Sequence, residues 1–354
     1  MFTRRRFLQA SLAVPLVTRL GWSSRQRLLP VQVSLERVTR RLVGLRPYRP
    51  SGFVVRAQAL DDKTVIHNYG HGGAGITMSW GTAQLAVELA WQGEEREFAV
   101  LGCGAVGLAT ARLLQRRGGK VTIYAKELPP ATTSNIAGGQ WGPASLSDPS
   151  RRTAAWNAQY ERAAAFAWRA YQDLVGEEYG VSWLDNYRFH RQAAPGAGND
   201  WEAQDAASFG PAQSPLPGYY ARRFTTMMIQ PSVYLPRMMQ DVLLYGGRIE
   251  VREFADLAAL SDLPEPVLIN CTGLGSRELF DDPELIPIRG QLSILLPQPE
   301  IDYAYLSGGL YMFPRKDGIV LGGTYDKRDF SLEPDLEAER RILLGHQEIA
   351  RALV

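Results

Sequence analysis

The sequence contains few of the residues that hold metals or build disulfide networks. Its 354 residues include two cysteines, Cys103 and Cys271, and four histidines. Neither cysteine lies in a CxxC motif or beside a histidine cluster, so the sequence predicts no metal site. Cys103 is expected inside a turn and Cys271 at the end of a buried strand. A disulfide between them is the less favoured alternative.

An excess of charge of either sign is also missing. The chain has 39 Lys and Arg against 37 Asp and Glu, a net charge of +2. Without a basic excess, nucleic acid is not expected as the main partner. There is no repeat and no GxSxG or HExxH motif, so nothing indicates hydrolysis or zinc chemistry. With 45% hydrophobic residues the chain can bury a large core, and we expect two domains.

No hydrophobic run is long enough to span a bilayer. At the N-terminus, Arg4 and Arg5 precede the short apolar stretch 10–17, in a pattern that resembles a twin-arginine export signal. We therefore expect residues 1–28 to be an export signal that directs the folded protein to the periplasm or the extracellular space. A basic tail on a cytoplasmic protein is the alternative.

The central motif is the stretch FAVLGCGAVGLATARLL, residues 98–114. It predicts a strand, a tight turn and a helix, the arrangement that binds the pyrophosphate of a dinucleotide. Gly102 is expected to make the turn, Gly104 to let the backbone approach the phosphates, and Gly107 to let helix and strand pack closely. The helix N-terminus then offers free N–H groups to the phosphates.

The second strand of this unit is expected at 120–125, and Lys126 and Glu127 follow it. A carboxylate at this distance from the glycines normally binds a ribose hydroxyl, and Glu127 is the candidate. Residues 132–143, TTSNIAGGQWGP, form a loop rich in hydroxyl groups and glycine. Its composition suits contacts to phosphate and to a ring.

A second glycine-rich turn stands before the first. The stretch VIHNYGHGGAGIT, 65–77, predicts a short strand and a turn that opens a helix near Thr77. This turn provides a second set of backbone donors for a cofactor. Nothing local makes His67 or His71 a catalytic base.

A candidate carboxylate-binding group lies in GLRPYRP, residues 44–50. The proline-stiffened backbone around Arg46 and Arg49 holds a guanidinium fork whose geometry suits bidentate capture of a carboxylate. A solvated basic turn is the alternative at this point.

The remaining pattern alternates helices and strands. We expect a long helix at 151–175, a strand at 181–191, a loop at 194–219, a strand, a helix starting at Pro231 and a strand across 220–251, a buried strand at 267–271, further strands from 286 to 326, and a polar C-terminal helix.

Several of these stretches together resemble the family of D-amino acid oxidases and D-aspartate oxidases. The resemblance is carried by GLRPYRP (44–50), VIHNYGHGGAGIT with SWG (65–81), VLGCGAVGLATA (100–111), YAKELPPATTSNIAGGQWGP (124–143), INCTG (269–273), IRGQL (288–292), and YMFP with VLGGTY (311–325).

The order of the motifs differs from that of the family, in which the glycine fingerprint comes first and the RPxRP and HNYGHGG blocks come last. The reversal indicates a circular permutation with residues 91–97 as the joiner and new ends near Val31 and Val354. A permutation requires that the family's original termini lie close together.

The resemblance implies an α/β fold in which a Rossmann-like FAD-binding domain is joined to an α+β substrate domain with an antiparallel sheet. The FAD-binding domain is expected at 51–147 and 225–287, and the substrate domain at 29–50, 148–224 and 288–354. The implied activity is oxidative deamination of D-amino acids to imino and 2-oxo acids, ammonia and hydrogen peroxide, with FAD as cofactor and oxygen as acceptor.

The resemblance also implies roles for individual residues. Arg46 and Tyr311 would bind the substrate carboxylate, and the Gly73 carbonyl would accept a hydrogen bond from the substrate amine. The residues expected to contact FAD are Gly72, Gly75, Ile76, Thr77, Gly102, Gly104, Ala105, Val106, Gly107, Lys126, Glu127, Thr132, Thr133, Ser134, Gly138, Gly139, Gln140 and, through its backbone, Val251.

Departures from the family concern the ribose-binding acid and the substrate pocket. Lys126 aligns with the ribose-binding acid, one position before Glu127. Ser307 replaces the second tyrosine of a lid over the substrate; either Tyr303 or Tyr305 substitutes for it, or the lid is shorter.

The arginines of a D-aspartate pocket are replaced by Tyr325 and Ala304, which favours neutral or apolar D-amino acids. Arg315 keeps an acidic substrate as an alternative.

Other functions remain open at this stage. The chain could be a flavin dehydrogenase of a related amino or imino acid that passes electrons to another carrier, a D-aspartate oxidase, or a flavin protein without catalysis. A homodimer is the oligomer expected.

Overall fold

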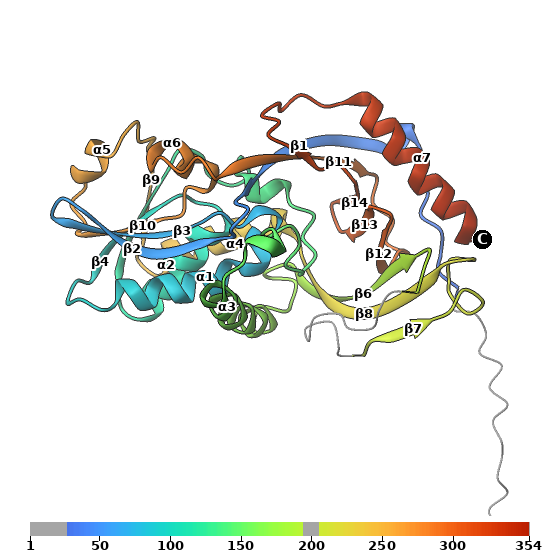
Figure 1. The fold of residues 1–354 in the computed structure, drawn as a ribbon, viewed down its shortest axis with the longest axis horizontal. Helices are drawn as coiled ribbons and strands as arrows, with labels where there is room; N and C mark the ends of the chain where they lie inside the picture. Colours follow the sequence, from blue (N-terminus) through green and yellow to red (C-terminus); the bar gives the residue numbers. More distant parts are fainter. Residues whose placement is uncertain (1–26, 194–204, 354) are drawn as a thin grey trace, which may run out of the picture.

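The computed structural model describes residues 27–193 and 205–353. The expected export signal up to residue 26, and residues 194–204 of the expected loop, lie outside this part of the chain. Figure 1 shows two layered units side by side, each built on its own sheet. The expected α/β architecture with a Rossmann-like unit and an antiparallel sheet is confirmed.

The first unit has a six-stranded sheet. Its strand order is β2 (Val54–Leu60), β3 (Lys63–Tyr69), β10 (Val267–Asn270), β4 (Glu97–Leu101), β5 (Lys120–Ala125) and β9 (Arg248–Val251). All neighbouring pairs are parallel except the hairpin of β2 and β3. β10 is buried along its whole length, as expected for a parallel strand covered on both faces.

Four long helices pack in this unit. They are α1 (Gly75–Ala90), α2 (Ala105–Arg116), α3 (Ala154–Gln172) and α4 (Pro231–Leu244). The sequence placed α3 in the substrate domain, but its buried face packs against α1, in the same core as the six-stranded sheet. The approach is close, because a Cβ on Gly81 of α1 would overlap the carbonyl group of Ala163 in α3. α3 therefore packs with the first unit.

The second unit is a nine-stranded sheet. Its order is β1 (Val38–Tyr48), β11 (Ile286–Leu295), β14 (Gly318–Gly322), β13 (Leu310–Arg315), β12 (Tyr303–Ser307), β6 (Val181–His190), β8 (Tyr220–Ile229) and β7 (Ala207–Phe209), and β15 (Asp326–Lys327) also pairs with β11. Only β12 and β6 run parallel among these pairs. β7 lies inside a stretch expected to be loop, and β8 carries residues 225–229 that the sequence placed in the FAD-binding domain.

Helix α7 (Leu336–Leu353) covers the outer face of this sheet, as Figure 1 shows. It packs through residues such as Ile342, Leu343 and Ile349 against a core that includes Tyr305. Two short helices, α5 (Ala258–Ser261) and α6 (Ser276–Leu279), lie in the other unit. No helix within the described ranges is both long and apolar enough to cross a membrane.

Two connections bear on the order of the motifs. α1 ends at Ala90 and only a short turn separates it from β4, which starts at Glu97. Leu28 and Leu353 share one hydrophobic core, and Gln347 Nε2 donates a hydrogen bond of 3.0 Å to the Val33 carbonyl. The proximity that a circular permutation requires is therefore present, and the permutation itself stays a prediction.

Candidate functional site

A cavity of about 1240 Å³ lies between the two units. Its floor is formed by residues that follow the carboxyl ends of β3, β10, β4, β5 and β9, and its far wall by β1, β11 and β13. Ligands of open α/β sheets bind at this edge of the sheet. The volume exceeds the ~300–1,000 Å³ of an ordinary small-molecule site, so the cavity has room for a dinucleotide together with a small substrate.

The turn between β4 and α2 forms one wall of the cavity. Gly102 has φ +110°, and a Cβ there would lie 2.6 Å from the Cys271 carbonyl oxygen, so only glycine fits. Gly104 is the N-cap of α2 and makes no side-chain cap hydrogen bond. Gly107 faces β4, where a Cβ would overlap the Gly102 carbonyl oxygen. The first turn of α2 is thus held against the sheet with its N–H groups toward the cavity.

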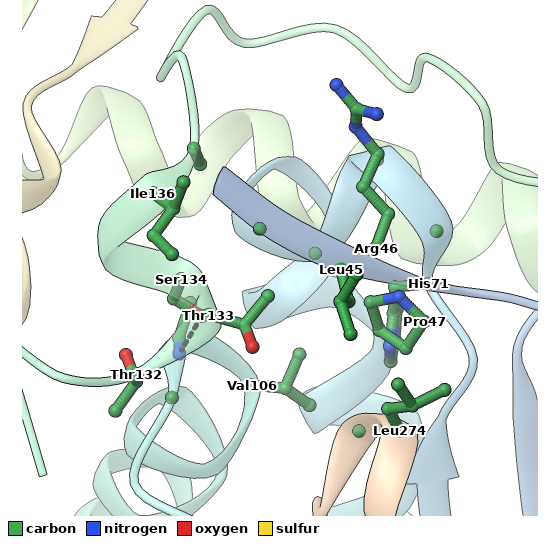
Figure 2. A pocket seen from close by; sticks show the side chains of 18 of the residues that line it. Leu45, Arg46, Pro47, His71, Val106, Thr132, Thr133, Ser134, Ile136 and Leu274 are labelled. Carbon is green, nitrogen blue, oxygen red and sulfur yellow. Dashed lines mark hydrogen bonds between the residues drawn. The ribbon is translucent and has the colours of Figure 1, made fainter. Parts of the chain in front are cut away.

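The loop after β5 contacts the same helix N-terminus. Ser134 Oγ accepts a 3.0 Å hydrogen bond from the Ala105 N–H, which Figure 2 shows as a dashed line. Thr132 and Thr133 lie beside Ser134, and Val106 faces the same space (Figure 2). This group of hydroxyls and helix N–H groups can bind phosphate oxygens, because both are hydrogen-bond donors at the positive end of a helix dipole.

The second glycine-rich turn brings the N-terminus of α1 to the cavity. Gly72 has φ +54°, and the Ser145 carbonyl lies where a Cβ would be. The first turn of α1 is fixed by two side chains: Thr77 Oγ1 donates to the Gly142 carbonyl at 3.1 Å, and the Tyr171 hydroxyl donates to the Ile76 carbonyl at 2.8 Å. Two helix N-termini therefore converge on one cavity.

Both histidines near this turn are buried and hydrogen-bonded to neighbouring side chains. Burial lowers the pKa of His71 to about 3, and its Nε2 lies 2.9 Å from Thr82 Oγ1. Burial also lowers the pKa of His67 to about 4, with Gln58 and Asn270 as hydrogen-bond partners. Both imidazoles are neutral and hold the strands and turns around the cavity in place.

Arg46 projects from β1 into the opposite part of the cavity, away from Val106 (Figure 2). Its guanidinium lies flat on Gly290, where a Cβ would collide with it. Nη1 is 3.4 Å from the Arg289 carbonyl oxygen and Nη2 is 3.5 Å from the Tyr311 hydroxyl. Within the described residues Arg46 makes no ion pair. A half-buried cation with only long contacts is available to an anionic ligand.

Tyr311 and Gly73 lie close to this guanidinium. The Tyr311 ring lies over Gly322 of β14, so that a side chain there would overlap it. Burial raises the pKa of Tyr311, while the nearby Arg46 lowers it. The hydroxyl therefore stays protonated and can donate a hydrogen bond. A Cβ on Gly73 would lie 3.5 Å from Arg46 Cδ, which places the Gly73 backbone beside the same group.

The substitutes expected for the lid tyrosine do not reach the cavity. Tyr303 and Tyr305 are 2% and 1% exposed, on the face of β12 that packs toward α7. Tyr303 donates to the Leu29 carbonyl at 2.6 Å, and the Tyr305 hydroxyl lies 2.6 Å from His346 Nδ1. Leu306, on the opposite face of β12, lines the cavity instead, because side chains alternate along a strand.

Arg315 does not support an acidic substrate. It is 7% exposed, and it makes two 2.8 Å ion-pair contacts with Asp317 and a hydrogen bond to the Ala137 carbonyl. Its charge is already neutralised outside the cavity. The cavity lining supplied by the second unit and the loop after β5 includes aromatic and aliphatic side chains, namely Ile136, Leu292, Leu306, Tyr311, Phe313, Tyr325 and Phe330, and also Thr324, whose carbonyl oxygen lies 3.5 Å from Arg46 Nη1.

Charged residues gather at the other end of the cavity, after β5 and β9. Lys126 and Glu127 line it there, as expected from the sequence. Val251 is the last residue of the edge strand and is not among the lining residues, which begin at Arg252, so its expected backbone contact stays a prediction. Arg252 and Glu253 were missed, and their position directly after a strand next to β5 was the available signal.

The other residues expected in the site fall as follows. Gly107, in α2, packs against the end of β4 and does not line the cavity. The other expected contacts, apart from Val251, line it, and they are Arg46, Gly72, Gly73, Gly75, Ile76, Thr77, Gly102, Gly104, Ala105, Val106, Lys126, Glu127, Thr132, Thr133, Ser134, Gly138, Gly139, Gln140 and Tyr311.

These residues fit FAD. The glycine cradle at Gly102 and Gly104 and the start of α2, where Ser134 Oγ contacts the Ala105 N–H, suit the pyrophosphate. The start of α1 and the loop at 138–140 suit the flavin ring, and the ends of β5 and β9 suit the adenosine. Arg46 lies in a part of the same cavity that these expected FAD contacts leave free, and this part is available to a substrate.

Comparisons with known proteins agree with this fit. The model of the DAO family, described as FAD dependent oxidoreductase, matches residues 22–89 and 97–352. The unmatched residues 90–96 fall on the turn between α1 and β4. A D-amino-acid oxidase of Streptomyces coelicolor is 33% identical over 276 residues, covering 73% of this chain and 80% of that protein. The human D-aspartate oxidase is 30% identical over 255 residues, covering 69% and 73%.

Solved structures share the fold. The glycine oxidase of Bacillus cereus matches with a TM-score of 0.54 and 16% identity, covering 73% of this chain and 79% of that one. The iminodiacetate oxidase of Chelativorans matches with a TM-score of 0.54 and 17% identity, covering 72% and 79%.

Proposed function

Because the chain belongs to the DAO family of FAD-dependent oxidoreductases, we propose that it oxidises D-amino acids with neutral or apolar side chains. The products are the imino acid, which water hydrolyses to the 2-oxo acid and ammonia, and hydrogen peroxide. When bound, the flavin accepts the two electrons and the hydrogen of the substrate's α C–H bond, and oxygen then takes up the electrons.

The observation that carries this proposal is the position of Arg46. Its guanidinium, which makes no ion pair within the described residues, lies in the same cavity as the two helix N-termini, and apolar and aromatic side chains line the part of this cavity formed by the second unit. A guanidinium fork binds a carboxylate bidentately, and the protonated Tyr311 hydroxyl can donate to the same carboxylate. The substrate is thereby held by its carboxylate, with its side chain among apolar groups.

The remaining groups orient the substrate. The Gly73 carbonyl can accept a hydrogen bond from the substrate amine. This contact fixes a second substituent of the α-carbon, in addition to the carboxylate. No base is needed from His71, whose imidazole is buried against Thr82. The chain's contribution is therefore orientation of the substrate, and positioning of this kind can supply a large part of a rate enhancement.

The decisive experiment uses the purified holoenzyme. We expect a flavin spectrum that bleaches without oxygen when D-alanine, D-methionine or D-phenylalanine is added, and does not bleach with the L-enantiomers. Bleaching by D-aspartate alone would replace the proposal by a D-aspartate oxidase, and bleaching by no amino acid would refute it. With oxygen present, one peroxide per turnover is expected. A much lower yield would instead indicate a dehydrogenase with another acceptor.

We also propose export by the twin-arginine route. The support is the sequence around Arg4 and Arg5, and a route that exports proteins already folded suits an enzyme that carries a bound flavin. In a bacterium with this export system, the flavin-containing protein is expected in the periplasm or medium, and Arg4→Lys with Arg5→Lys is expected to retain it in the cytoplasm. Unchanged distribution of the double variant would contradict the proposal.

A further inference from the structure

A pair of opposite charges spans the ends of two neighbouring strands at the adenosine end of the cavity. Lys126 follows β5, Glu253 follows β9, and these two strands are parallel neighbours in the sheet. Lys126 Nζ lies 2.7 Å from Glu253 Oε1, and both residues line the cavity. The pair therefore occupies the place where a ribose is normally bound.

The chemistry of ribose binding requires an acceptor at this place. The hydroxyls of a ribose are bound by a carboxylate because its oxygens accept both O–H donors. Lys126 stands where that acid is expected, yet an ammonium group has only donors. The acceptor has to come from another residue. Three glutamates line the cavity: Glu127 and Glu253 follow β5 and β9, whereas Glu278 lies in α6 after β10 and is 3.6 Å from Arg277 Nε.

The contacts favour Glu253. Lys126 holds it through Oε1, and the described residues offer no partner to Oε2. Glu127 makes no ion pair or hydrogen bond within the described part of the chain. Binding of the ribose by Glu127 would therefore cost the conformational entropy of its side chain, which no partner holds beforehand. Glu253 is already oriented by its 2.7 Å contact with Lys126.

We propose that Glu253, supplied by β9, binds the adenosine ribose of FAD, and that Lys126 is the positioning residue that holds it. At the usual position of the acid, directly after β5, this chain has the cation Lys126. The acid, Glu253, instead follows β9, the neighbouring strand. Because both side chains are about two-thirds exposed, the pair contributes little to folding stability. Its loss can therefore be measured as loss of cofactor alone.

The test is the dissociation constant of FAD, measured as flavin fluorescence released when each holoenzyme is diluted. Glu253→Gln is expected to weaken FAD binding by at least about tenfold, as for the loss of a hydrogen bond to a charged group. Glu127→Gln is expected to change it by less than about twofold. Glu97→Gln is the matched control, because it breaks an exposed pair with Lys120 at 2.9 Å, at the opposite ends of β4 and β5.

A double variant tests whether an acid directly after β5 can take over the role of Glu253. Lys126→Glu in the Glu253→Gln background returns an acid to the end of β5, and is expected to recover most of the lost affinity. A larger effect of Glu127→Gln, or wild-type affinity in Glu253→Gln, would overturn the inference. Melting temperatures within about 2 °C of wild type are expected for all the variants, as for surface changes of small energetic effect. None of these readouts depends on the substrate.

Discussion

Arg46→Ala is expected to lower kcat/KM for the preferred D-amino acid by about 10- to 150-fold while FAD stays bound. Hydrogen bonds to a charged group contribute about 1.5–3 kcal/mol, which corresponds to this range. The carboxylate contact also fixes the α-hydrogen, so part of the loss is expected in kcat. The measurement is the rate of anaerobic flavin reduction as a function of substrate concentration.

A graded series separates the charge of Arg46 from its geometry. Arg46→Lys keeps the charge but has a single ammonium in place of the planar fork, so an intermediate loss is expected. Gly290→Ala changes no charge, yet its Cβ would occupy the place of the Arg46 guanidinium. We expect it to weaken substrate binding in the same direction as Arg46→Lys.

Arg49 is the matched control for this series, because it lies in the same GLRPYRP motif. It pairs with Asp282 at 2.9 Å and with Glu284 at 2.7 Å, away from the cavity lining. Arg49→Gln is expected to lower the melting temperature and to leave the reduction rate of the flavin-loaded protein unchanged. Wild-type reduction kinetics in Arg46→Ala would show that the substrate carboxylate binds elsewhere.

The parts of the site that could be read from the sequence are those in which local backbone geometry requires a particular residue. Gly102 has to be glycine because of its positive φ and the adjacent Cys271 carbonyl, and the turn before α1 imposes a similar demand on Gly72. Such positions are visible in a motif, since the constraint and the residue lie within a few positions of each other.

The errors arise where the fold, and not the local sequence, decides which groups a side chain contacts. Tyr303 and Tyr305 share a face of β12, but only the fold shows that this face packs toward α7. The charge of Arg315 is cancelled by Asp317, a neighbour in sequence whose orientation depends on the turn between β13 and β14. An amphipathic helix such as α3 does not specify which sheet it covers.

The largest structural effect is expected from Gly107→Ala. Alanine is normally the better residue inside a helix, by about 1 kcal/mol. At Gly107, however, the added Cβ would overlap the Gly102 carbonyl oxygen, and Val100 Cγ1 lies 3.5 Å from the same point. Because the obstacle is backbone, α2 has to move away from β4 or the turn has to open. Overpacking of this kind costs about 1–3 kcal/mol or more, which exceeds the gain in helix propensity.

The same movement would displace the N–H groups that face the cavity, so Gly107→Ala is expected to be purified with little FAD and with a lower melting temperature. Gly345→Ala in α7 is the control. Its Cβ would lie 2.6 Å from Leu310 Cδ1, the mobile end of a side chain that can shift, so full flavin content and nearly unchanged stability are expected. Full flavin occupancy in Gly107→Ala would mean that the approach of α2 to β4 does not control cofactor binding, and that other contacts, among them the Ser134 hydroxyl and the start of α1, are sufficient to hold it.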